Sequence, residues 1–269
     1  MGLEARYQFG LSLVREAGAL ALSYFNARDK LTIQHKGVQD LASEADLNTE
    51  LLIKQRISET FPKDAFLGEE TGPTTYAEGQ GIWVVDPIDG TQPFICGLSC
   101  WCVSIAFVQN GELQFGMVYA PSRDELFAGG AGHKATLNGE VIHGSSAKSV
   151  RDGLISAGYS PKAGPDMFLP VFTQLLDEGG MFFREGSGAL AICYVANGRL
   201  IGFFEAVIRS WDCLGALAVA QAAGLRFNPF LNGQGLFKGN PLIVGNAAIY
   251  AALNRIVDEK GKGLWGPLD

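Results

Sequence analysis

Two aspartates three positions apart are the residues of this sequence best suited to binding a cation. The apolar run Trp83-Val84-Val85 leads into Asp86, and Asp89 follows after Pro87 and Ile88. The pattern predicts that Asp86 ends a buried strand and that Pro87 turns the chain, so that Asp89 returns beside it. Two carboxylates held together in a partly buried turn repel each other unless a cation lies between them. With the Ile88 carbonyl as a third oxygen, and no nitrogen or sulfur, the ligand set favours Mg²⁺ over zinc.

Gly90 and Thr91, which follow Asp89 directly, indicate that a phosphate group binds beside the cation. Their backbone amides lie at the expected start of a short helix, where such groups bind phosphate. A D-x-x-D motif by itself is more often an ordinary turn with helix caps. The metal hypothesis therefore requires further acidic residues at the same place.

Four other acidic residues could supply them. Glu69 and Glu70 follow a short apolar strand. Because adjacent residues of an extended chain lie on opposite faces, one of them would point into a site and the other away from it. Asp212 opens an otherwise apolar helix, and Asp46 lies at the head of another. Taken singly, each is more often a surface acid or a helix cap.

Periodicity and turn residues predict a mixture of helices and strands, with α/β layers. Helices are expected at 3–26, 43–61, 167–177, 189–196, 212–223 and 247–257, and strands at 65–67, 82–85, 102–108 and 113–119. Asn110-Gly111 predicts a hairpin, and so does Gly130–Ala135, despite its loose likeness to a dinucleotide loop. The buried stripe of the second helix is expected to be Leu47, Leu51 and Ile57. We expect two tightly packed halves, 1–148 and 149–269.

Composition excludes several classes of protein. The chain has 269 residues, of which 47% are hydrophobic, so it can build a large core. Its net charge of −7 argues against a nucleic-acid or anionic membrane surface, and no stretch is long and apolar enough to span a bilayer. The five cysteines show no disulfide spacing, which favours a reducing cytoplasm, and Cys100 and Cys102 are expected on one face of a strand. No zinc, serine-hydrolase or Walker motif is present.

Three segments taken together resemble the inositol monophosphatase family of Mg²⁺-dependent, lithium-sensitive phosphomonoesterases. They are Gly68-Glu69-Glu70, the run from Asp86 to Thr91, and the run from Trp211 to Ala216. Their order and spacing agree from Lys36 to Gly224. The resemblance implies a layered α/β/α/β/α sandwich, commonly a homodimer, that hydrolyses a small phosphate monoester.

The resemblance also assigns roles to the acidic residues. Glu69, Asp86 and the Ile88 carbonyl would hold one Mg²⁺, and Asp86, Asp89 and Asp212 a second, with a third ion also using Glu69. Asp89 would also face the substrate. This set implies two or three Mg²⁺ ions in each active site.

The remaining assignments concern water and substrate. Glu70 would orient a water molecule. Asp46 and Thr91 would position and deprotonate the water molecule that attacks the phosphate. Gly90 and Thr91 would also contact the substrate phosphate. The alcohol of the substrate would contact the loop from Arg184 to Ala189, and also Glu205. The expected contact residues are Gly186, Ser187, Gly188 and Glu205.

Departures from the family pattern leave the substrate alcohol open. This chain has Ile201 where relatives often carry an acid, Gln92-Pro93-Phe94 where Thr-Asn-Phe is commoner, and Arg209 where His is frequent. The leading hypothesis is a phosphatase for myo-inositol monophosphate or a similar polyol phosphate. A histidinol-phosphate phosphatase is the alternative, and a nucleotide 3′-phosphatase is a weaker one. A regulatory binding protein that retains the phosphatase fold, contacting RNA or the transcription machinery, is the alternative of another class.

Overall fold

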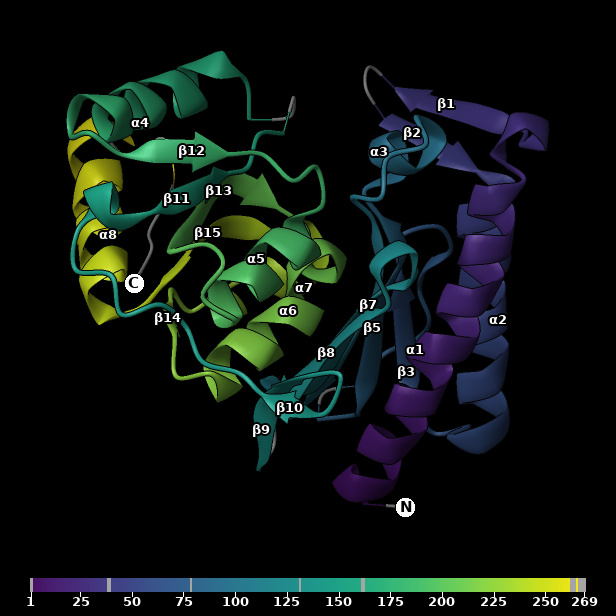
Figure 1. Ribbon diagram of the computed structural model, residues 1–269. Helices are drawn as coiled ribbons and strands as arrows, with labels where there is room; N and C mark the ends of the chain where they lie inside the picture. Colours follow the sequence, from purple (N-terminus) through teal and green to yellow (C-terminus); the bar gives the residue numbers. More distant parts are fainter. Residues whose placement is uncertain are drawn as a thin grey trace.

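The protein is built of five layers, which alternate helices and sheets (Figure 1). The computed structural model describes residues 2–37, 40–77, 79–130, 132–160, 163–261 and 265. Helices α1 and α2 cover an eight-stranded sheet, α5 and α6 fill the middle layer, and α4 and α8 cover the far side of a five-stranded sheet. The α/β sandwich expected from the sequence is confirmed. The helices are α1 (Leu3–Asn26), α2 (Glu44–Thr60), α3 (Thr91–Ile95), α4 (Pro165–Asp177), α5 (Gly188–Ala196), α6 (Ser210–Ala222), α7 (Gly235–Lys238) and α8 (Ala247–Gly261).

The larger sheet is mostly antiparallel and has the order β10-β9-β8-β7-β6-β5-β3-β4, in which β3 and β5 pair in parallel. Both predicted hairpins are confirmed: Asn110-Gly111 joins β6 to β7 with φ angles of 55° and 75°, and β8 pairs with β9. The strands are β3 (Ala65–Gly68), β4 (Gly72–Pro73), β5 (Ile82–Asp89), β6 (Cys102–Gln109), β7 (Glu112–Ala120), β8 (Glu125–Gly130), β9 (His133–Leu137) and β10 (Glu140–Val141).

The smaller sheet has the order β12-β11-β13-β15-β14. Its first three strands run parallel, and β15 is antiparallel to both of its neighbours. The strands are β11 (Leu154–Ala157), β12 (Met181–Phe183), β13 (Gly202–Ile208), β14 (Arg226–Phe227) and β15 (Asn240–Gly245). A separate two-stranded hairpin of β1 (Ile33–Gly37) and β2 (Asp40–Ser43) precedes α2.

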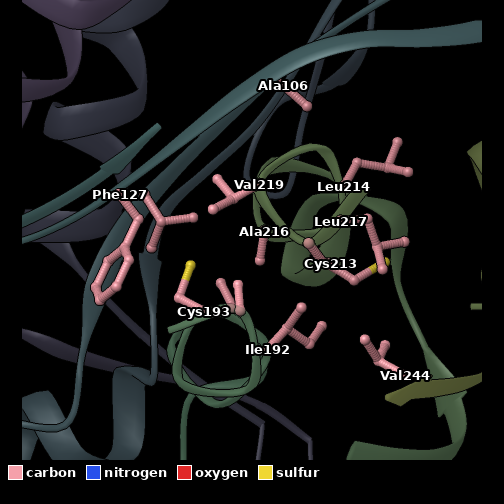
Figure 2. Close-up of a cluster of buried hydrophobic side chains, with 14 of the residues drawn as sticks. Ala106, Phe127, Ile192, Cys193, Cys213, Leu214, Ala216, Leu217, Val219 and Val244 are labelled. Atoms are coloured by element: carbon pink, nitrogen blue, oxygen red, sulfur yellow. The ribbon is translucent and has the colours of Figure 1, made fainter. Parts of the chain in front are cut away.

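The middle layer forms the core that joins the two sheets (Figure 2). Ile192 and Cys193 of α5 face Leu217 of α6, with Phe127 of the larger sheet on one side and Val244 of the smaller sheet on the other. Because these side chains are fully or almost fully buried, their packing fixes both helices relative to both sheets.

Helix α6 lies unusually close to the larger sheet because glycines face each other there. A Cβ atom on Gly116 of β7 would lie only 2.3 Å from the Gly215 carbonyl oxygen of α6. Any side chain at Gly116 would push the helix away from the sheet. The first turn of α6, which carries Asp212, is tied to β6, the neighbour of β5, because the Ser104 hydroxyl donates to the Trp211 carbonyl over 3.2 Å.

Helix α2 buries a different face from the one predicted. Leu47 and Leu51 are 40% and 45% exposed, so their assignment to the buried stripe was wrong, although Ile57 is buried. The buried face instead includes Asp46 and Glu50. Both carboxylates accept hydrogen bonds inside the protein, and these bonds make their burial tolerable.

The prediction that Cys100 and Cys102 share a strand face was wrong, because β6 begins at Cys102 and Cys100 lies before it, partly exposed. Across the described ranges, helices long enough to cross a bilayer are too polar to do so.

Candidate active site and metal centre

The candidate residues line one hollow, which has a volume of about 740 Å³. Its wall is built from the turn after β3, the end of β5, the loop before α5, strand β13 and the start of α6. Eleven of the thirteen residues predicted for the site contribute to it: Glu69, Asp86, Ile88, Asp89, Gly90, Thr91, Gly186, Ser187, Gly188, Glu205 and Asp212. The other two are connected to it, because Asp46 bonds to Thr91 and Glu70 follows Glu69.

Three carboxylates from distant parts of the chain converge in this hollow. Oxygen atoms of Glu69, Asp86 and Asp212 all lie within 4.8 Å of one another. Asp89 is outside this tightest group, although it lines the same hollow and its charge acts on Asp86. The arrangement offers several hard oxygen ligands at one point, as a divalent cation requires.

Strand β5 does not end at Asp86, so the predicted turn at Pro87 is wrong. The strand runs on to Asp89, and Pro87 and Ile88 lie opposite the single residue Val103 of β6. This β-bulge bends the strand and re-aims its side chains. The Ile88 amide donates to Asp86 Oδ1 over 2.9 Å, which fixes the orientation of that carboxylate.

Asp89 is tied to the first turn of α5. Its Oδ2 atom accepts a hydrogen bond of 2.7 Å from the Ala189 amide and another from the Ser187 hydroxyl. The same hydroxyl accepts a 3.1 Å bond from the Leu190 amide and so caps the helix. The Ser187 residue is only 2% exposed, and both of these bonds of its hydroxyl are made inside the protein.

Asp46 and Thr91 form a hydrogen-bonded pair at the edge of the hollow. Asp46 Oδ2 accepts from the amide and the hydroxyl of Ser43, over 2.8 Å and 2.7 Å. Asp46 Oδ1 then lies 3.2 Å from the Thr91 hydroxyl, which is also 3.1 Å from the Ile88 carbonyl. Gly90 makes this geometry possible, because its φ of 95° belongs to the left-handed region.

Glu50 is a site residue that sequence reasoning missed. It is fully buried, and its two carboxylate oxygens accept hydrogen bonds of 2.7 Å from the amides of Glu70 and Thr71. It thereby holds the turn that carries Glu69. Inside a helix, a Glu ordinarily indicates a solvated face. Its spacing of four residues from Asp46 was the available signal, since residues i and i+4 share a helix face.

A family model described as the inositol monophosphatase family matches residues 3–262. The chain belongs to this family. The resemblance deduced from the sequence is thus confirmed. The curated relative named Nus factor SuhB from Escherichia coli (strain K12) is 33% identical over 242 residues, which cover 89% of this chain and 90% of the relative. The Haemophilus influenzae protein of the same name is 32% identical over 90% of this chain and 92% of its own length.

Solved structures resemble the fold over almost its whole length. The extragenic suppressor protein suhB from Bartonella henselae is 29% identical, with a TM-score of 0.86 and coverage of 93% of this chain and 96% of that one. The inositol monophosphatase from Anabaena (Nostoc) sp. PCC 7120 is 26% identical, with a TM-score of 0.82 and coverage of 97% and 98%. Family and fold together support phosphatase activity in general.

The residues of the hollow fit the Mg²⁺ dependence that is general in the inositol monophosphatase family. The converging ligand atoms are all carboxylate oxygens, and Asp86 and Asp89 are only 1% and 8% exposed. Buried acids of like charge are costly unless protons or cations neutralise them. Mg²⁺ accepts this type of ligand set.

Burial and mutual repulsion raise the pKa values of these acids. Burial, followed by the charges of Glu69, Asp89 and Asp212, raises the pKa of Asp86 well above its ordinary value. Burial raises the pKa of Asp89 to about 6, despite its hydrogen bonds to the start of α5. Burial and then the charge of Asp89 raise the pKa of Asp212 to about 7, and burial with both of these aspartates raises that of Glu205 to about 8. A bound cation reverses these shifts, because it favours the charged forms.

These shifts predict how the stability of the metal-free protein depends on pH. A carboxyl group with a raised folded-state pKa binds more protons when folded than when unfolded, so stability falls as pH rises. The window runs from about 4, where unfolded carboxyls titrate, to the pKa of about 8 of Glu205. In EDTA we expect the melting temperature to fall across this range, and saturating Mg²⁺ to restore it at the alkaline end.

Thermal unfolding followed by circular dichroism at several pH values checks this expectation. The Asp212→Asn variant serves as a control, because removing one of the acids should flatten the dependence on pH. A metal-free protein whose melting temperature rises or stays constant between acidic and alkaline buffers would contradict this account of the acids.

Glu50→Gln is expected to weaken Mg²⁺ activation. The amide group of Gln cannot accept both backbone hydrogen bonds, so the turn that carries Glu69 should loosen. Loss of such a supporting group typically costs about tenfold to a hundredfold in metal affinity or activity. The Mg²⁺ concentration for half-maximal phosphate release measures the effect, with Glu59→Gln, an exposed acid of the same helix, as the matched control. Equal Mg²⁺ requirements for both variants would show that Glu50 does not act on the site.

Proposed function

We propose that this protein is a Mg²⁺-dependent phosphomonoesterase that hydrolyses a small polyol phosphate, with myo-inositol monophosphate as the leading candidate. The convergence of Glu69, Asp86 and Asp212 within 4.8 Å carries the proposal. In this proposal Glu69, Asp86 and the Ile88 carbonyl hold one Mg²⁺. Asp86, Asp89 and Asp212 hold a second, and a third ion would also use Glu69.

Mg²⁺, when bound, supplies positive charge that neutralises the phosphoryl group and acidifies the attacking water. Thr91 accepts a hydrogen bond from that water and passes its own proton toward Asp46, which lies 3.2 Å away. Burial raises the pKa of Asp46, which makes it a better proton acceptor, and Ser43 keeps its carboxylate in place. Glu70 helps to orient the water.

Substrate recognition is proposed to use two sides of the hollow. Gly90 and Thr91 contact the phosphate through their backbone amides. On the other side, the backbone of Gly186, Ser187 and Gly188 meets the alcohol. Glu205, which lines the hollow and is held by the central strand β13, accepts a hydrogen bond from a substrate hydroxyl.

Phosphate release from a panel of esters tests the proposal. We expect Mg²⁺-dependent hydrolysis with myo-inositol 1-phosphate ahead of histidinol phosphate and adenosine 3′-phosphate, and inhibition by millimolar lithium. Histidinol phosphate far ahead of inositol phosphate would favour the alternative phosphatase. A protein that releases no phosphate from any ester would not be the enzyme proposed.

A second candidate is a regulatory binding protein that retains the phosphatase fold. The observation in its favour is the name Nus factor SuhB, which relatives at 32% and 33% identity carry. The net charge of −7 disfavours direct contact with RNA, so such a role would use a protein partner. A protein captured by the purified chain, together with no detectable ester hydrolysis, would support this role over the enzyme.

A further inference from the structure

A second hollow, which we call the apolar annex, adjoins the proposed active site. It has a volume of about 260 Å³. Three of its residues, Ala157, Tyr159 and Arg184, also line the active-site hollow, so the two hollows share a wall. The annex is lined by Ala157, Tyr159, Phe168, Phe172, Phe182 and Arg184.

Aromatic rings that pack on one another form most of the annex wall. Tyr159 meets Phe168 edge-on with ring centroids 5.3 Å apart, and Phe168 stacks on Phe172 at 5.0 Å. Phe172 in turn meets Phe182 edge-on at 4.8 Å. Phe168 and Phe172 pack against the buried core below β11 and β13, so this wall is formed in advance of binding. Such walls present ring faces and edges to a flat apolar group.

Arg184 marks the boundary between the annex and the active-site hollow. Arg184 lines both hollows, and its positive charge opposes the burial that raises the pKa of Glu205. A guanidinium stacks well on an aromatic face. Since Arg184 lines the annex as well as the active-site hollow, its guanidinium is available to stack on a ring held there.

We propose, on the basis of the phosphatase function above, that the annex binds an aromatic ring carried by the substrate's alcohol. Phosphate monoesters whose alcohol bears such a ring a few atoms from the reacting oxygen are then substrates in addition to the polyol phosphates proposed above. A cavity of about 150 Å³ with apolar walls holds benzene, so the annex has room for one ring. A phenyl or indole group suits it better than a ring with many polar edges, whose hydrogen bonds would be lost.

Matched esters test the annex. Propyl phosphate carries no ring, whereas benzyl, 2-phenylethyl and 3-phenylpropyl phosphate place one at increasing distances from the reacting oxygen. We expect kcat/KM for the best phenyl ester to exceed that for propyl phosphate by at least about tenfold, within the range that apolar pockets provide. Phe182→Ala should abolish most of this advantage and leave propyl phosphate hydrolysis unchanged. Phe183→Ala is the matched control, because Phe183 is the next residue of β12 and lies outside the annex.

The possible outcomes distinguish a failure of the annex proposal from a failure of the proposed phosphatase function. Hydrolysis of propyl phosphate and myo-inositol 1-phosphate without any gain from a ring would overturn the annex proposal alone. No Mg²⁺-dependent hydrolysis of any ester would overturn both. If Phe182→Ala lowered activity on propyl phosphate equally, Phe182 would have only a structural role. If it changed the molecular mass in solution instead of the ring preference, the annex would be a contact between copies of the chain, and the proposal would be wrong.

Discussion

Asp89→Asn is expected to lower kcat by about two to three orders of magnitude, as happens when one preorganised charge-stabilising group is lost from an active site. The substitution removes one negative charge from the proposed cation site. It also presents an amide to the Ser187 hydroxyl and the Ala189 amide, which now donate to Asp89. The overall fold should survive, because the side chain keeps its shape.

Phosphate release at saturating Mg²⁺, measured together with thermal unfolding, checks this prediction. Asp177→Asn is the matched control, since Asp177 is an exposed acid at the end of α4. The control should retain full activity. Undiminished turnover by Asp89→Asn would refute the assignment of this residue to the metal centre.

Asp46→Asn is expected to lower kcat by about a hundredfold to ten-thousandfold, the usual contribution of a positioned proton acceptor. Thr91→Val should have a comparable effect, because the Thr91 hydroxyl bonds to Asp46 and, in the proposed mechanism, connects it to the attacking water. Since the two residues act as a unit, the double variant should lose little more than either single variant. KM should change much less than kcat.

Steady-state kinetics of the two single variants and the double variant measure this coupling. If the two losses multiply, the residues act independently and the proposed proton path is wrong. Asp46 also caps α2 through Ser43, so the melting temperature of each variant must be compared with its activity. A loss of activity that only follows a loss of stability would point to a structural role.

Local signals in the sequence were sufficient for much of the fold. The hairpin at Asn110-Gly111 and the helices α1, α4, α5 and α8 follow from turn residues and apolar periodicity, which act over a few residues. The convergence of Asp86 and Asp212 depends on packing across the whole molecule, including the close approach at Gly116. It could be inferred only through the resemblance to the inositol monophosphatase family.

The errors arose where tertiary contacts overrode local patterns. Leu47 and Leu51 suggested the buried face of α2, but Glu50 occupies that face because two backbone amides satisfy its charge. Pro87 suggested a turn, but a β-bulge let the strand continue through it. Neither the partners of Glu50 nor the bulge in β5 is encoded in a short stretch of sequence.

Anomalous scattering from crystals soaked in Mn²⁺ and phosphate tests the central claim most directly, since Mn²⁺ prefers the same oxygen ligands as Mg²⁺. The account predicts ion peaks bound by Asp86 together with Glu69 and Asp212, with phosphate beside Gly90 and Thr91. A hollow without ion peaks at saturating Mn²⁺, or ions held only by other acids, would contradict it.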